Sequence, residues 1–368
     1  MKIGIVGYPN VGKSSLFKTL TKQEVLIADR PFATINPNIG QIVAKDQRLE
    51  KLQKIYKSKK IVYPVIQLID IAGIVKDAHK GKGLGNKFLS STRETNLILV
   101  VIRHFNDPKT KNNELTDIAL IDQLKTIYLE LLYADYEIVN KVLPKLNSQH
   151  KKYPDDIFIK RKIKILNKFL KIVQKEEFFI DKNFTDDEIE SIKEYNFFWY
   201  KPLYVLVNTD SLNNDSNNKE FDELRNFLNN NSINWVVINI KFEDELIMYN
   251  ANELKEIEEW TKDYGKQLDY LIFNILKISS SDIFFTCGEQ EVRGWIFKKN
   301  SNAKEAAGSV HTDIEKNFNI LEKINYQELI SESEKTDKID FRKLTKFESK
   351  NYIVKDGDIC HFRFNKPS

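Results

Sequence analysis

The sequence predicts an α/β fold, with a projecting helical insertion and a smaller β-rich domain after it. Three observations support this prediction: a glycine-rich turn joins a short strand to a helix near residue 7, a long gap separates two apolar strands, and short β-type segments begin at Ser281. Alternation of buried strands with helices is typical of a parallel sheet. We therefore expect domains at residues 1–280 and 281–366, with the insertion at about 122–198.

Composition narrows the class of protein. The 368 residues carry 57 basic and 53 acidic side chains, and 41% of the residues are hydrophobic, as in a globular protein. No apolar run approaches the roughly 20 residues that cross a bilayer. Cys287 and Cys360 are too few for a disulfide framework or a zinc cluster. We expect a cytoplasmic protein without a membrane partner.

The first motif lies between a strand and a helix. After the apolar strand Lys2–Val6, the residues Gly7-Tyr8-Pro9-Asn10-Val11-Gly12-Lys13-Ser14 fit the GxxxxGKS pattern of a P-loop. Such a loop wraps phosphates with backbone N–H groups, while Lys13 meets the β- and γ-phosphates and Ser14 binds Mg²⁺. A chance glycine turn is the alternative, and the strand before and the helix after argue against it. The predicted nucleotide-binding residues here are Asn10, Val11, Gly12, Lys13, Ser14 and Ser15.

A second apolar strand supplies a metal-binding carboxylate. Val65–Asp70 is followed by Ile71-Ala72-Gly73, so that Asp70 and Gly73 form a DxxG element. In P-loop proteins this acid holds Mg²⁺ through water and the glycine N–H meets the γ-phosphate. Thr34, in a loop between two prolines, is expected to complete the metal shell when a triphosphate is bound. The predicted metal ligands are thus Ser14, Thr34 and Asp70, and the predicted catalytic residues are Lys13, Asn10, Thr34 and Gly73.

The base of the nucleotide is expected to lie against the end of a further strand. Lys201–Val207 leads into Asn208-Thr209-Asp210-Ser211, where a guanine-specific protein has NKxD. A serine cannot make the charged bidentate contact that the aspartate makes with guanine. We assign Asn208, Thr209 and Ser211 to the nucleotide-binding set and predict that guanine selectivity is lost. The sequence after the next strand, Ile240-Lys241-Phe242, also departs from the usual SAK base-capping motif.

With these residues in view, the chain resembles the YchF subfamily of Obg-like ATPases along nearly its full length. The matching stretches are GYPNVGKSSLFKTLT from Gly7, RPFATINPNIG from Arg30, DIAGIVKDAHKGKGLGNKFLS from Asp70, RET from Arg93, EVRGWIF from Glu291, AAGSVHTDIEKNF from Ala306 and NYIVKDGDICHFRFN from Asn351. The resemblance implies a G domain interrupted by a coiled-coil arm and a C-terminal TGS domain with a β-grasp fold. It also implies a preference for ATP over GTP and association with the large ribosomal subunit or the whole ribosome.

The chain departs from the family pattern at three positions. Ser211 replaces the glutamate of NxxE that is linked to adenine preference, Asn112 stands near the family's hydrolytic histidine, and Ala33 replaces a cysteine found in many relatives. Ile74 also occupies the position after DxxG where many Ras-like proteins orient the attacking water with glutamine. We therefore expect slow hydrolysis. Asn10 resembles the asparagine of potassium-activated relatives, which makes K⁺ near the β/γ bridge a further hypothesis.

The long gap predicts a helical arm. Strands ending near Ile102 and beginning at Leu203 lie about a hundred residues apart, whereas a βαβ crossover needs about 30. Apolar residues recur at three- and four-residue spacing on both sides of a break around Pro144 to Pro154, which favours an antiparallel coiled-coil hairpin over two helices on the sheet. Eleven Lys or Arg stand between Lys141 and Lys175 against Asp155 and Asp156. This charge suggests RNA contact, with a solvated helix face as the alternative.

The last segment predicts strands at 282–286 and 291–298, a helix at 303–317, and a hairpin between 352–354 and 358–364. The segment from Ser281 to Ser368 has fifteen basic and fifteen acidic residues, which argues against a general polyanion surface and leaves a specific RNA or protein contact open.

Three functions remain open on these grounds. The leading hypothesis is a monomeric ATP-hydrolysing switch in which Thr34 and the loop from Gly73 to Gly85 reorder around the triphosphate and change contact with the ribosome. The others are a nucleotide-gated ribosome- or RNA-binding module with negligible turnover, and a GTPase.

Overall fold

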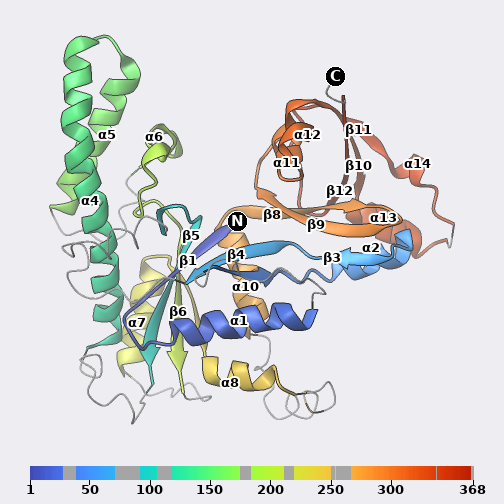
Figure 1. The fold of residues 1–368 in the computed structure, drawn as a ribbon, viewed down its shortest axis with the longest axis horizontal. Helices are drawn as coiled ribbons and strands as arrows, with labels where there is room; N and C mark the ends of the chain where they lie inside the picture. The colour runs from blue at the N-terminus through green and yellow to red at the C-terminus, as the bar shows by residue number, and fades with distance from the viewer. Residues whose placement is uncertain are drawn as a thin grey trace. The chain divides into compact units, whose positions relative to one another are not determined.

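The computed structural model describes residues 1–27, 39–70, 92–105, 118–174, 184–210, 219–249, 253, 267–336 and 338–365. Its contacts divide the chain into two compact units (Figure 1). We call Lys2–Gly40 with Gln67–Gly265 the P-loop unit, and Met1, Gln41–Ile66 and Lys266–Ser368 the carboxy-terminal unit. Within the described ranges, no helix has the length and hydropathy needed to cross a membrane.

A six-stranded sheet, parallel from β4 to β7 in its strand order, forms the centre of the P-loop unit. The strand order is β2 (Ile39–Val43), β4 (Val65–Asp70), β1 (Lys2–Val6), β5 (Leu97–His104), β6 (Leu203–Thr209) and β7 (Asn234–Ile238). β1 pairs in parallel with β4 and β5, and the parallel pairing continues through β6 to β7. These strands read as near-continuous apolar runs because both faces are covered. The predicted α/β fold is confirmed, and the carboxyl ends of the strands share one edge.

Helices of this unit follow the strands in sequence. α1 (Lys13–Ile27) begins directly after the first loop, and its Leu16 and Leu20 are buried. α7 (Lys219–Asn230) buries Phe221, Leu224 and Leu228, and α8 (Ile240–Leu246) begins just after β7. The apolar spacing of three and four residues therefore forms the buried stripe that packs each helix.

The insertion between β5 and β6 contains two long helices that lie side by side. α4 (Leu120–Lys152) and α5 (Ile157–Val173) reverse direction at the turn 153–156, and we call this pair the arm (Figure 1). α6 (Asp186–Ser191) and the 3-10 helix η4 (Lys193–Tyr195) follow. The predicted break around Pro144 to Pro154 falls at the end of that interval, because α4 continues through Pro144 to Lys152. Proline removes one backbone hydrogen bond, a loss that packing along a long helix can outweigh.

The carboxy-terminal unit contains a mixed sheet. Its order is β11 (Lys346–Glu348), β10 (Phe318–Asn325), β12 (Asp358–Phe364), β8 (Ser281–Cys287), β9 (Glu291–Lys298) and β3 (Lys60–Val62). β8 and β9 are antiparallel, β12 is antiparallel to β10, and β12 lies parallel to β8. Among the strands from β8 onward, the first and last therefore lie side by side in the middle, which is the strand order of a β-grasp.

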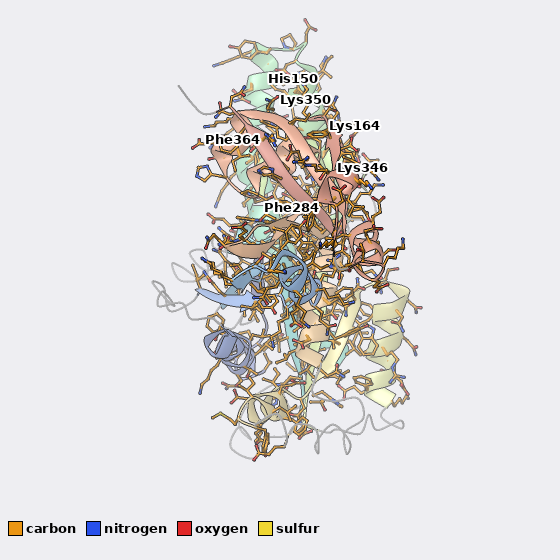
Figure 2. All side chains as sticks on the ribbon, turned by 90° about the vertical axis from the view of Figure 1, so that its right-hand side faces the viewer. His150, Lys164, Phe284, Lys346, Lys350 and Phe364 are labelled. Carbon is orange, nitrogen blue, oxygen red and sulfur yellow. The ribbon has the colours of Figure 1, made fainter. Side chains whose placement is uncertain are left out.

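One apolar cluster holds this sheet against α11 (Ala303–Gly308). It contains Phe284, Leu321, Cys360, Phe362 and the three alanines of α11. Phe284 lies in the interior, whereas the labelled Lys346, Lys350 and Phe364 are on the outside of the unit (Figure 2). Small side chains on α11 allow the helix to approach the aromatic residues of the sheet closely.

Two predictions for this region are wrong. The helix expected at 303–317 is two helices, α11 and α12 (Thr312–Lys316), because the His311 side chain accepts a hydrogen bond from Asp313 N and begins a new helix. The expected hairpin is also absent: residue 353 forms a bridge with Asn302, while β12 pairs with β10, a strand that the sequence reading missed. A local side-chain cap decided the first case, and backbone pairing with distant segments decided the second.

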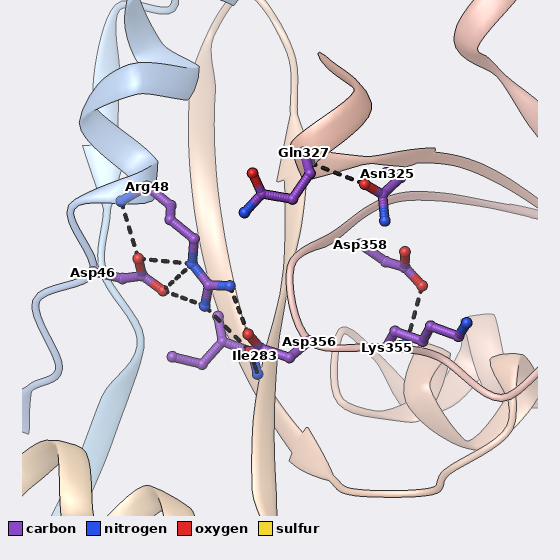
Figure 3. Close-up of polar contacts among 8 residues, drawn as sticks. All are labelled: Asp46, Arg48, Ile283, Asn325, Gln327, Lys355, Asp356 and Asp358. Carbon is purple, nitrogen blue, oxygen red and sulfur yellow. Dashed lines mark hydrogen bonds and ion pairs between the residues drawn. The ribbon is translucent and has the colours of Figure 1, made fainter. Parts of the chain in front are cut away.

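Residues 41–66 group with the carboxy-terminal residues, which differs from the predicted division at 280/281. β3 pairs in parallel with β9, and Arg48, at the start of α2 (Arg48–Tyr56), makes two ion pairs (Figure 3). Arg48 Nη2 lies 2.7 Å from Asp46 Oδ2, and Arg48 Nη1 lies 2.6 Å from Asp356 Oδ2. Asp356 Oδ1 also accepts a hydrogen bond from Ile283 N at 3.0 Å. The remaining helices of the unit are α10 (Gln267–Ile278), α13 (Tyr326–Ser333) and α14 (Phe341–Leu344).

Candidate functional site

The first loop of the P-loop unit has the tight curvature of an anion-binding loop. Asn10 has φ of 62° and Gly12 has φ of 101°, so the backbone is left-handed at two positions. A Cβ atom on Gly7 would lie 2.5 Å from the Val101 carbonyl oxygen, which leaves room only for glycine. Left-handed residues in such a turn direct successive N–H groups toward one side. The loop can therefore surround a phosphate at the start of α1.

Lys13 lies within this loop. Its side chain is buried, and Nζ donates a hydrogen bond of 2.6 Å to the Tyr8 carbonyl oxygen. The ammonium group is thus held across the curve of the backbone, where a β- or γ-phosphate is expected. Ser14 and Ser15 are exposed in the first turn of α1, as is Asn10 in the loop. Val11 is fully buried, so only its main chain can face a ligand.

Asn208 fastens the loop to the end of β6. Its Nδ2 donates to the Val11 carbonyl oxygen at 3.0 Å, and its Oδ1 accepts from Ile240 N at 3.3 Å. Only 6% of Asn208 is exposed, and a Cβ atom on Gly12 would collide with its amide. Asn208, near the end of β6, therefore joins the loop after β1 to the segment after β7. This role had a signal in the sequence, since Asn208 matches the first residue of NKxD, but only the structure shows both partners.

The segment after β7 is a helix start. Asn239 Oδ1 accepts from Phe242 N at 3.0 Å and so caps α8, while Asn239 Nδ2 donates to the Asp210 carbonyl oxygen at 3.4 Å. Thr19 of α1 donates to Asp244 Oδ1 at 3.3 Å. The sequence that replaces SAK therefore forms the start of a helix, and its Asn239 contacts Asp210 just after β6. Thr209 is buried next to Asn208.

Several predicted site residues fall outside what the structure describes. Thr34, Gly73 and Ser211 lie in ranges that are not described, and of Asp70 only the backbone is. That backbone pairs with Ile5 in the register of β4 and β1, next to the start of the first loop. The exposed Ser14 and the end of β4 at Asp70 lie at the same edge of the sheet. Serine and aspartate carry oxygen, the donor that Mg²⁺ prefers, so these residue types fit magnesium.

The base of the arm is fixed by a buried charge. Arg93, in the segment that precedes β5, donates from Nη1 to Asp135 Oδ1 of α4 at 2.5 Å. Asp135 Oδ2 accepts from Phe198 N at 2.7 Å and Trp199 N at 3.0 Å. Burial raises the pKa of Asp135 to about 6, against the opposing effect of Arg93. Arg93 is visible in the sequence as part of RET, but no local pattern indicates its partner, which lies 42 residues away.

Burial also governs the two cysteines. It raises the pKa of the Cys287 thiol to about 12 and that of Cys360 well above its ordinary value, and both thiols are free. Neither thiol is therefore a nucleophile at neutral pH. Among the described residues no group of His, Cys, Asp or Glu has the arrangement of a metal cluster.

Comparison with known families gives matches in both units. Residues 2–132 match the family described as "50S ribosome-binding GTPase". Residues 282–365 match the family of YchF GTPase carboxy-terminal regions, whose description reads "Protein of unknown function".

Individual relatives match over the whole chain. The "Ribosome-binding ATPase YchF" of Bacillus subtilis is 35% identical to this chain, and the alignment covers 98% of each protein. The protein of the same name from Mycoplasma genitalium is 35% identical and covers 99% of both. The solved structure of the Schizosaccharomyces pombe YchF GTPase aligns with a TM-score of 0.84 at 31% identity, covering 99% of this chain and 97% of that one.

Proposed function

This chain belongs to the YchF family, and from that premise we propose that it is a ribosome-associated ATPase that acts as a nucleotide switch. The observation that carries the proposal is the first loop, where Lys13 is held across a left-handed turn between β1 and α1. The names of the bacterial relatives support both ATP hydrolysis and ribosome binding. The oxygen-rich edge of the sheet supports magnesium as the cofactor.

Phosphate binding follows from the residues of the loop. The N–H groups between Gly7 and Gly12 and the start of α1 supply positive potential, and Lys13 moves its hydrogen bond from Tyr8 O to the β- and γ-phosphates. Ser14, Thr34 and Asp70 are the proposed magnesium ligands. The bound ion neutralises the charge that develops on the phosphate oxygens. Gly73 is proposed to meet the γ-phosphate with its N–H.

Base recognition is proposed to favour ATP. Asn208 already uses both ends of its amide within the protein, so it positions the loop for the base. Thr209 and Ser211 are proposed to lie near the purine. Because Ser211 cannot accept a charged bidentate contact, guanine loses its usual advantage.

Hydrolysis is proposed to be slow. Ile74 cannot orient an attacking water by hydrogen bonding, and Asn112 stands where the family's histidine is expected. Asn10 is exposed in the loop and is proposed to assist K⁺ near the β/γ bridge. Ile74 and Asn112, in place of the water-orienting glutamine and the family histidine, also favour the second candidate, a nucleotide-gated binding module with negligible turnover.

Ribosome contact is proposed to depend on the bound nucleotide. Thr34 and the loop from Gly73 to Gly85 would reorder around the triphosphate, and the large subunit or the whole ribosome would sense the change. We propose RNA contacts through the basic arm and the TGS-like carboxy-terminal residues, with the protein acting as a cytoplasmic monomer.

Nucleotide binding is tested by calorimetry with MgATP and MgGTP. Lys13→Ala should weaken ATP binding by about ten- to a hundredfold, because a charge-assisted hydrogen bond contributes about 1.5–3 kcal/mol. Lys18→Ala, which removes an exposed lysine from the same helix, is the matched control. Undiminished binding in Lys13→Ala would overturn the proposed site, and a strong GTP preference in competition for one labelled analogue would replace ATPase with GTPase.

Turnover is tested by single-turnover hydrolysis with and without ribosomes, in K⁺ and in Na⁺. If the protein is a switch, ribosomes should accelerate hydrolysis. If they do not, the nucleotide-gated binding module is the remaining function. Turnover that is unchanged in Na⁺ and in Asn10→Ala rejects the role of K⁺.

A further inference from the structure

The end of the arm carries exposed apolar side chains. Tyr153, Ile157 and Phe158 are 64%, 75% and 78% exposed, and all three belong to the turn between α4 and α5 or its edges. Large apolar side chains exposed to this degree cost free energy unless a partner covers them. We call residues 151–161 the tip.

The conformation of the tip is well defined by hydrogen bonds. Tyr153 N donates to Gln149 O at 2.9 Å and ends α4, while Asp156 N donates to Tyr153 O at 3.2 Å and closes the turn. Asp156 Oδ1 then accepts from Phe158 N at 2.8 Å and Ile159 N at 3.1 Å, which caps α5. The capping carboxylate is therefore committed to the helix start. Phe158 is held on the exposed side of the first turn.

Positive charge at the tip has no acidic partner among the described residues. Farther down α5, Lys162 pairs with Glu194 at 2.8 Å and Lys168 pairs with Glu188 at 3.2 Å. At the tip, by contrast, exposed cations make no ion pair within the described ranges: they are Lys151, Lys152, Lys160 and Arg161. Figure 2 labels His150, just before this group, and Lys164, just after it. Ion pairs thus neutralise two cations farther down α5, whereas the four exposed cations of the tip outnumber its two carboxylates, Asp155 and Asp156.

Aromatic rings beside unneutralised cations fit one kind of partner. Unpaired bases stack on aromatic faces, and Lys and Arg meet the phosphates between them. A fully paired duplex hides its base faces and cannot use the rings. We propose that the tip binds an unpaired stretch of ribosomal RNA, with Tyr153 and Phe158 as the stacking residues. This inference rests on the proposed ribosome association.

The test measures binding of the full chain to a labelled hairpin RNA with a single-stranded loop, and to the same stem as a blunt duplex. Stacking tolerates any sequence, so the loop sequence is not critical. The hairpin should bind more tightly than the duplex, and Tyr153→Ala with Phe158→Ala should weaken hairpin binding at least tenfold. Tyr270→Ala with Phe273→Ala removes one tyrosine and one phenylalanine of similar exposure on α10 and should leave binding unchanged.

The charge contribution is tested by salt titration. Lys160→Gln with Arg161→Gln should make the plot of log affinity against log salt shallower by about 1.4, since each phosphate contact on a single strand contributes about 0.7. Lys51→Gln with Lys54→Gln, which removes two exposed lysines from α2, should leave that slope unchanged.

Co-sedimentation of the same variants with ribosomes separates the outcomes. The inference is overturned if the native chain and the variant with both Tyr153→Ala and Phe158→Ala bind the hairpin with equal affinity. Loss of ribosome binding with unchanged hairpin binding also overturns it, since the tip then contacts a ribosomal protein. A native chain that binds hairpin RNA through the tip but never sediments with ribosomes overturns the proposed function and leaves only RNA binding by the tip.

Discussion

The two ends of the arm differ in burial and in the partners of their charged side chains. At the base, Asp135 is fully buried and both of its carboxylate oxygens are bonded, to Arg93 and to the backbone of Phe198 and Trp199. At the tip, cations and aromatic rings are exposed, and the only committed carboxylate caps a helix. Buried polar groups must be satisfied to be tolerated, whereas exposed ones are free to meet a partner. The difference indicates that one end holds the arm in place and the other end makes contact.

The largest expected effect comes from removing the buried carboxylate. Asp135→Ala should lower the free energy of unfolding by about 3–5 kcal/mol, because it leaves the Arg93 charge uncompensated and two buried N–H groups without an acceptor. Urea unfolding measures this change. Asp155→Ala at the exposed tip is the matched control and should change stability by no more than about 0.5 kcal/mol. Equal effects at the two positions would remove the proposed distinction between the ends.

The pH dependence of stability tests the same carboxylate. The pKa of Asp135 is raised from 3.8 to about 6 in the folded protein, so the folded state holds its proton more tightly than the unfolded state. Its contribution to stability is complete below about pH 4 and is lost as the pH rises to about 6, by up to about 3 kcal/mol.

The difference in unfolding free energy between the native chain and Asp135→Asn isolates this effect, since the other carboxylates cancel. That difference should fall between about pH 4 and pH 6 and then level off. A difference that rises with pH over this interval would mean that Arg93 outweighs burial and lowers the pKa.

Local motifs were predictable from the sequence, and distant pairings were not. The loop from Gly7 to Ser14 was predicted because its spacing alone defines a strand, a turn and a helix. The ion pair between Arg93 and Asp135 depends on a contact that no local pattern encodes. The arm's turn lies at the end of the predicted interval of Pro144 to Pro154, since Pro144 is a local signal that packing overrides.

The carboxy-terminal unit shows the same limit. Its β8–β9 hairpin was predicted as two neighbouring strands, because the turn lies between them in sequence. The pairing of β3 with β9 joins residues more than two hundred positions apart, and the Asp356 contact with Arg48 spans 308. The sequence therefore predicted the fold class, while the grouping of residues 41–66 required coordinates. For the candidate site, the GxxxxGKS pattern indicated the loop between β1 and α1, whereas the hydrogen bonds of Asn208 required coordinates.

A smaller effect is expected at the helix cap of the tip. Asp156→Ala removes the acceptor for Phe158 N and Ile159 N and should cost about 1 kcal/mol of stability. Asp156→Asn keeps an accepting oxygen and should restore most of this loss. Urea unfolding of both variants measures the cap, and the same low cost in both would show that the first turn of α5 does not depend on it.

The smallest effect on stability is expected where the arm's charge is neutralised. The Lys162 hydrogen bond lowers the pKa of Glu194, and this exposed ion pair should contribute at most about 1 kcal/mol to stability. Glu194→Gln therefore should unfold almost as the native chain does, yet it frees Lys162 to join the basic tip.

The same variant tests RNA binding. Its plot of log affinity for hairpin RNA against log salt should become steeper by about 0.7, the value of one added phosphate contact. Glu332→Gln, which breaks an exposed pair with Lys335 in the carboxy-terminal unit, removes the same charge and should leave the slope unchanged. An equal change in both variants would mean that total charge, and not its position on the arm, governs binding.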